Sequence, residues 1–233
     1  MGAESTRRFH GGGRPHMAQA PLPPRDAPNI QQQSKRKNEQ RRRRRQELRA
    51  QDDAEGALDE ALQRLITGPS ADVARALARM FADPKRRIEC GQRCALPPLV
   101  AACLSVDAEV AAPCCLALAR LFTGAAELQA QAVEAGCPQA LVTCLQTHSE
   151  TSLVVVASCR ALERMAVGVG AAARRDAAAE AGALPTLVSA VRRWVADESA
   201  SAACRAALRS LTRDSGRLQE AAVRAGADLQ WLL

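Results

Sequence analysis

The sequence predicts an all-α fold in which three helices recur along the chain as a solenoid, behind a basic N-terminal arm. Alanine fills 49 of 233 positions (21%), aromatic residues make up 2%, and similar apolar segments return every 41–46 residues. An all-β sandwich or barrel needs β-branched and aromatic residues in its strands, so that class is nearly excluded. A core of Ala, Leu and Cys favours helices packed at close range.

The arm differs from the rest of the chain in charge. Residues 1–50 hold 13 Lys or Arg and 4 Asp or Glu, a net charge of +9, whereas the remaining 183 residues have a net charge of −2. The Gly, Pro and Gln runs between residues 11 and 33 cannot bury a core, so we expect residues 1–51 to be a disordered arm. From about Asn38 to Gln51 no residue breaks a helix, so this stretch could fold on a partner.

Three glycines indicate the repeat. Gly136, Gly182 and Gly226 each end an Ala-rich helix with the pattern A-x-x-A-G, at intervals of 46 and 44 residues. Glycine supplies the left-handed conformation that ends a short helix abruptly. A short apolar helix follows, with Pro near its start, as in Pro185. Cys94 begins an earlier copy, 42 residues before Gly136.

A third helical element recurs in the same phase. Its copies begin with A-L at Ala76, Ala117, Ala161 and Ala207. We therefore expect helices at 57–67 and 70–82, three-helix units at 85–122, 127–167 and 173–213, a helix at 217–225 and a stub at 228–233. Because the chain stops partway into a unit, we expect a truncated array; the alternative is that its end packs on something.

These segments resemble the armadillo repeat. Glu180 to Val188, E-A-G-A-L-P-T-L-V, is similar to the junction of the first two helices of such a repeat, and A-L-x-R-L resembles the A-L-x-N-L stretch of its third helix. The resemblance covers about Ala57 to Leu233. It implies a right-handed armadillo/HEAT-type α-solenoid over residues 52–233, with about three to four repeats, the last incomplete. It also implies a protein-interaction function with many conceivable partners.

In such a solenoid the third helices line the concave face. There, importin-alpha proteins carry a W-x-x-x-N pattern that binds a basic peptide. The matching positions here hold neither Trp nor Asn: they are Arg75, Leu116, Arg160 and Ala206 for Trp, and Arg79, Arg120, Arg164 and Ser210 for Asn. A row of arginines would repel a basic cargo. It predicts a groove for an acidic peptide; the alternative is a solvated face whose arginines pair with acids such as Asp107 or Glu163.

The basic run in the arm resembles the importin-beta-binding segment of importin-alpha proteins, in which arginines precede an E-L-R-type stretch. The matching residues here are Lys35, Arg36, Lys37, Arg41, Arg42, Arg43, Arg44, Arg45, Leu48 and Arg49. The resemblance implies an importin-alpha-like adaptor connected with nuclear protein import, present in cytoplasm and nucleus. The sequence departs from the family in two ways: the spacing is compressed, and Asp52-Asp53 stands where a second basic cluster is expected.

Other interpretations of the arm stay open. The basic run could be the chain's own nuclear localisation signal on a generic armadillo scaffold. It could also be an RNA-binding tail, although no aromatic residue interleaves the arginines for base stacking, which disfavours RNA as a partner. Residues 1–6 fit the acylation pattern M-G-x-x-x-[ST], so an acylated Gly2 would anchor the scaffold to a membrane.

The sequence predicts no enzyme, cofactor or metal site. It contains no Gly-rich phosphate loop, and its histidines are His10, His16 and His148. The nine cysteines form no C-x-x-C pair, so zinc-ligand spacing is absent. Cys114-Cys115 falls inside a predicted third helix, which favours core packing over redox chemistry. The longest apolar stretch, 95–104, is about half the length of a membrane-spanning helix.

Overall fold

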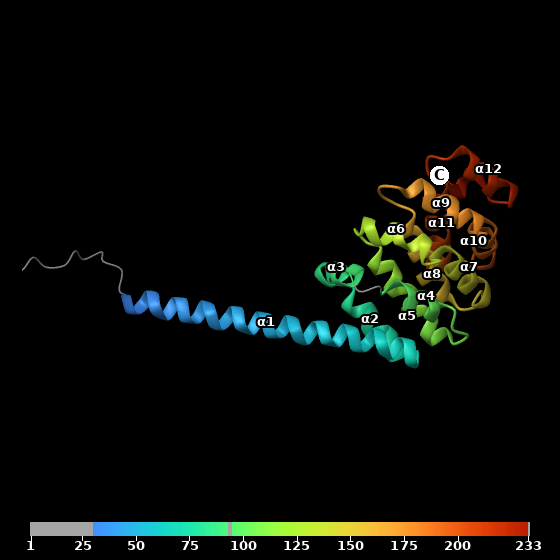
Figure 1. The fold of residues 1–233 in the computed structure, drawn as a ribbon. Helices are drawn as coiled ribbons and strands as arrows, with labels where there is room; N and C mark the ends of the chain where they lie inside the picture. The colour runs from blue at the N-terminus through green and yellow to red at the C-terminus, as the bar shows by residue number, and fades with distance from the viewer. Residues whose placement is uncertain (1–29, 93–94, 233) are drawn as a thin grey trace, which may run out of the picture. The chain divides into compact units, whose positions relative to one another are not determined.

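The computed structural model describes residues 30–92 and 95–232, and within these ranges every regular element is a helix (Figure 1). Contacts divide the chain into two units, residues 1–51 and 52–233. In the first unit, the residues from Ile30 onward belong to helix α1 (Ile30–Thr67). The basic segment 35–49 is therefore helical, where the sequence predicted a disordered arm with a helix-forming stretch. No residue in the segment breaks a helix, which accounts for the difference.

The second unit confirms the all-α repeat fold. After the end of α1 come α2 (Ala71–Met80), α3 (Pro84–Gln92), α4 (Leu96–Cys103), α5 (Ala108–Leu121), α6 (Ala126–Glu134), α7 (Cys137–Thr147), α8 (Ser152–Met165), α9 (Ala171–Glu180), α10 (Ala183–Arg193), α11 (Glu198–Thr212), α12 (Gly216–Arg224) and α13 (Leu229–Leu232). Three-helix units recur in the predicted phase and begin and end within a few residues of their predicted bounds, whereas the helix predicted at 57–67 is the end of the longer α1.

The predicted glycines separate the first and second helices of the units. Gly136 and Gly182 have φ angles of 74° and 86°, and each is the N-cap of the following helix, α7 or α10. Gly226 follows α12 with a φ of 94°. These left-handed conformations are costly for residues with a Cβ, so glycine at these points turns the chain without backbone strain.

Helices α2, α5, α8 and α11, the third helices of successive units, pack side by side in chain order. The leucine of each A-L motif lies in the core: Leu77, Leu118, Leu162 and Leu208 are all fully buried. Each such burial contributes about 1.5–3 kcal/mol. The neighbouring alanines let the helices approach closely. We call the outward surface of these four helices the third-helix face.

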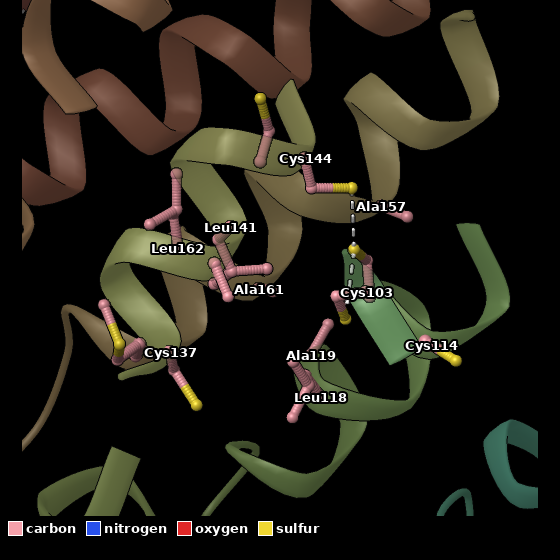
Figure 2. Close-up of a cluster of buried hydrophobic side chains, with 14 of the residues drawn as sticks. Cys103, Cys114, Leu118, Ala119, Cys137, Leu141, Cys144, Ala157, Ala161 and Leu162 are labelled. Carbon is pink, nitrogen blue, oxygen red and sulfur yellow. Dashed lines mark hydrogen bonds between the residues drawn. The ribbon is translucent and has the colours of Figure 1, made fainter. Parts of the chain in front are cut away.

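Cysteines fill part of this core. The seven described cysteines from Cys103 to Cys204 are buried and unbridged. Figure 2 shows Cys103 and Cys144 in a row of sulfur atoms completed by Cys115, whose Sγ lies 3.5 Å from that of Cys103 and 3.6 Å from that of Cys144. Burial raises the pKa of Cys114 to about 12. Cys114 and Cys115 thus lie in the core, as predicted.

Candidate functional site

A groove of about 290 Å³ lies on the third-helix face, between α5 and α8. Each helix contributes four residues spaced i, i+3, i+4 and i+7, which is one face of a helix. These are Glu109, Ala112, Pro113 and Leu116 from α5, and Leu153, Val156, Ala157 and Arg160 from α8; Arg75, Ala108 and Thr151 complete the lining. We call this set of residues the groove.

The groove brings together three of the predicted ladder residues, Arg75, Leu116 and Arg160. They come from three successive third helices, because each lies immediately before an A-L motif. The next helix, α11, carries Ser199, Ala202, Ala203 and Ala206 at the equivalent positions. The third-helix face therefore continues beyond the groove as a surface of small side chains.

The walls of the groove are mainly apolar and are open to solvent. The side chain of Leu153 is 72% exposed, and Leu116 and Val156 are half-buried. Sequence reasoning missed Leu153, Val156 and Pro113. The helical spacing counted back from the A-L motif, which puts these residues on the same face as Leu116 and Arg160, could have found them.

Two arginines at the groove differ in their partners. Arg75 donates to Asp72 at 2.9 Å and to Glu109 at 3.3 Å. The hydrogen bond to Asp72 contributes most to raising the pKa of Arg75 above its ordinary value. Arg160 is exposed, and none of the side chains that the structure describes pairs with it. The groove thus has one free guanidinium beside an apolar wall.

Pro113 interrupts the hydrogen bonding of α5 at the groove. It lies inside the helix and has no N–H to donate to the carbonyl of Glu109, one turn earlier. Local rules are most often broken at functional sites. The carbonyl of Glu109 therefore lacks its usual helical donor.

The second predicted row, Arg79, Arg120 and Arg164, lies one turn further along the same helices and outside the groove lining. The guanidinium of Arg120 donates to the carbonyl of Ala78 on α2, so it links neighbouring repeats. Arg79 donates to the carbonyl of Arg75 at 3.3 Å. Arg164 is exposed.

The predicted acid partners of these arginines have other roles. Asp107 accepts a hydrogen bond from the backbone N–H of Glu109 at 2.9 Å, and so caps α5. Among the described residues, neither Asp107 nor Glu163 forms an ion pair with an arginine of the ladder. Arg75 pairs instead with Asp72 on its own helix and with Glu109 on α5.

His148, the histidine within the array, is a structural residue. It is buried, and its Nε2 lies 2.9 Å from the carbonyl oxygen of Ser105. A carbonyl accepts, so Nε2 carries the hydrogen. Trp194, at the equivalent position of the next unit, donates its Nε1–H to the carbonyl of Ser149 at 3.2 Å. In two successive units, the ring at this position thus donates to a backbone carbonyl of the preceding unit.

The basic segment presents its described side chains to solvent. Arg36, Lys37 and Arg41 to Arg44 are all exposed, and Arg43 pairs with Glu39 at 3.0 Å. The side chains of Lys35, Arg45, Leu48 and Arg49, and Gly2 as a whole, lie outside the described residues. A surface ion pair of this kind contributes little to stability, so the charge of the segment stays available.

A second pocket, of about 430 Å³, lies between α7 and α10. Gln146 and Thr186 bond to each other across it at 3.1 Å. In the described parts of the chain, no three His, Cys, Asp or Glu side chains are placed to hold a metal ion. None of the helices described there is long and apolar enough to cross a membrane.

Comparison with known proteins supports the fold. No protein family and no curated protein matches the sequence. Two crystal structures of engineered proteins, both Northeast Structural Genomics Consortium targets, resemble the chain. Target OR329 matches with a TM-score of 0.63 and 26% identity, over 75% of this chain and 68% of its own. Target OR497 matches with a TM-score of 0.62 and 27% identity, over 71% of this chain and 40% of its own.

The chain is therefore an all-helical repeat protein that resembles engineered proteins. The likeness to these two proteins supports the repeat fold and extends to no importin function. The importin-alpha resemblance rests on the sequence segments alone.

Proposed function

We propose that the chain is a non-enzymatic protein-interaction scaffold that binds a segment of a partner protein in the groove between α5 and α8. The observation that carries this proposal is the exposed apolar wall beside the free guanidinium of Arg160. An exposed apolar surface with a polar rim is typical of interaction sites. The buried cysteines and the engaged ring of His148 are core groups, which favours binding over catalysis.

Selection of phage-displayed random peptides on the wild-type chain tests the groove. We expect enriched peptides to lose binding to the Leu153→Asp variant, because a carboxylate would then stand in the apolar wall. Val195→Asp is the matched control: Val195 is 71% exposed, like Leu153, and lies outside the groove. Peptides that bind Leu153→Asp as well as they bind the wild type would contradict the proposal. Circular dichroism and thermal unfolding check that both variants fold.

The exposed basic helix favours a second role, as the importin-alpha-like part of the proposal. Its arginines would bind an acidic receptor of the importin-beta kind by charge and bidentate hydrogen bonds, with strong salt dependence. The resemblance of residues 35–49 to the importin-beta-binding segment and the exposure of Arg41 to Arg44 support this role. The alternative is a scaffold whose basic segment is only its own localisation signal or which, with an acylated Gly2, is anchored to a membrane.

A pull-down with importin-beta and importin-alpha separates these roles. We expect importin-beta to bind the wild type at low salt and to lose binding when Arg42 to Arg45 are changed to Ala. Failure of the wild type to bind importin-beta at low salt would contradict the adaptor role. Binding of importin-alpha instead would identify the segment as cargo. The intact mass of the protein made in a eukaryotic host tests acylation of Gly2.

A further inference from the structure

We infer that the groove selects an extended protein segment that places an aliphatic side chain next to a carboxylate, with the carboxylate on Arg160. This inference rests on the proposed function and adds the chemistry of the partner. It is drawn from three features of the groove: its free charge, its apolar wall and its backbone acceptor.

The free charge at the groove is positive. The groove lining holds two guanidinium groups, Arg75 and Arg160, and one carboxylate, Glu109, which accepts from Arg75. Arg160 has no partner among the described residues, and Arg164 lies exposed one turn further along the same helix. A carboxylate on the partner would therefore gain a charge-assisted and potentially bidentate hydrogen bond. An ammonium or guanidinium there would meet like charge.

The apolar wall stands within the same helical face as Arg160. Leu153 and Val156 lie seven and four residues before it on α8, so their side chains and its own lie along one stripe. Across the groove, Leu116 supplies the apolar surface of α5. A partner segment that runs along this stripe toward the C-terminal end of α8 contacts the aliphatic side chains first and the guanidinium of Arg160 next. Apolar burial would supply affinity, and the arginine would select the sign of charge.

The backbone acceptor favours an extended segment over a helix. Pro113 cannot donate to the carbonyl of Glu109, so that oxygen lacks its usual helical partner. An extended chain has free backbone N–H groups with which to bind it, whereas a helix uses its own N–H groups internally. The small residues of α11, Ala202, Ala203 and Ala206, leave the path beyond Arg160 open.

Fluorescence anisotropy tests this chemistry with two labelled peptides of equal length. One alternates Leu and Val with Asp, and the other has Lys in place of each Asp. We expect the acidic peptide to bind the wild type at least about tenfold more tightly than the basic one. Arg160→Gln should remove most of this preference and Arg160→Glu should reverse it. Arg224→Gln, an exposed arginine on α12, is the matched control.

The outcomes separate the inference from the proposed function. Equal or tighter binding of the basic peptide to the wild type overturns the inference, as does an unchanged preference in Arg160→Gln. If, in addition, Leu153→Asp weakens the binding of either peptide, the groove still binds protein segments and only the assigned chemistry fails. If Leu153→Asp leaves the binding of both peptides unchanged, the groove itself is wrong.

Discussion

The guanidinium of Arg174 donates to the side-chain oxygen of Gln129 at 3.2 Å, and together these two buried residues bind carbonyls at the ends of α5 and α8 and in the loop after α8. Gln129 donates to the carbonyls of Phe122 and Arg164 at 2.7 and 2.9 Å. Arg174 donates to the carbonyls of Met165, Val167 and Val169 at 2.6, 2.7 and 2.9 Å. The last carbonyls of a helix have no partner within it, so these side chains supply one.

Arg174 occupies a position that holds leucine in the units directly before and after it. Counted by the repeat, it corresponds to Leu128 on α6 and Leu218 on α12, and all three side chains are buried. Desolvation lowers the pKa of Arg174 from its ordinary value. The hydrogen bonds, in place of an acidic partner, compensate the buried charge.

Replacing Arg174 by Leu should destabilise the array, although leucine fits this position elsewhere. The change leaves the side-chain oxygen of Gln129 and three backbone carbonyls without the donor that Arg174 supplies. The loss of these hydrogen bonds should lower the free energy of unfolding by about 2 kcal/mol or more. The midpoint of urea unfolding measures the loss. Arg224→Leu, on the exposed side of α12, should leave the midpoint within experimental error. Because removal of a buried charge is stabilising in some proteins, an equal or higher midpoint for Arg174→Leu would contradict the role given to its hydrogen bonds.

Asp197 should stabilise the array at neutral pH and cease to do so in acid. It caps α11 by accepting from the N–H of Ala200 at 3.0 Å, and it accepts from the Ser152 hydroxyl on α8 at 2.6 Å. The hydrogen bond from Ser152, followed by those from the backbone, lowers the pKa of Asp197.

The folded-state pKa of Asp197 is thus below its unfolded value of about 3.9. Its contribution is complete above that pH and is lost as pH falls through the lower, folded value. Asp197→Ala should lower the thermal midpoint by about 2–4 °C at neutral pH, and the difference should shrink below about pH 3.9. Ser152→Ala should give a smaller loss at neutral pH. A difference between Asp197→Ala and wild type that stays constant into acid would contradict the prediction.

Pro113→Ala should make the protein more stable and its groove a weaker binder. Alanine restores a helical N–H for the carbonyl of Glu109, and an interior proline costs about 3 kcal/mol or more. The same bond removes the acceptor offered to a partner, so the acidic peptide should bind about three- to tenfold more weakly. Thermal unfolding and anisotropy on the same sample measure both effects. Tighter binding together with higher stability would show that the proline is only a structural defect.

The buried thiols should be unreactive in the folded protein. Burial raises the pKa of Cys114 and Cys137 to about 12, and the thiolate is the reactive form. Peptide-resolved mass spectrometry after iodoacetamide treatment near pH 8 should find both residues unmodified in the native chain and modified after denaturation in urea. Rapid native labelling of Cys114 or Cys137 would contradict their placement in the core.

The repeat phase could be predicted from the sequence because local residues determine it. Three of the first helices end at a glycine because the chain there needs a left-handed conformation, and the A-L leucine is buried in every unit. Both features are therefore visible as repeats in the sequence. Gly136 and Gly182 adopt the left-handed conformation that the pattern required. The part of α1 between residues 30 and 51 was only weakly indicated by the sequence, because the absence of helix-breaking residues alone predicts it.

The site was predicted in part. The ladder placed Arg75, Leu116 and Arg160 on one face, and they line the groove. The partners of the arginines could not be predicted, because they depend on side-chain reach across repeats: Arg120 donates to the carbonyl of Ala78, and Arg75 binds Glu109. Arg174 could have been recognised as unusual, since alignment of the repeats puts it opposite two leucines.

Hydrogen–deuterium exchange of the chain with and without a selected peptide tests the central claim, binding in the groove, most directly. Our account predicts slower exchange in the peptides that cover residues 108–116 and 151–160, the two walls of the groove. It predicts no change over residues 185–193, which line the larger pocket between α7 and α10. Protection that falls on residues 185–193 and spares both walls of the groove would contradict it.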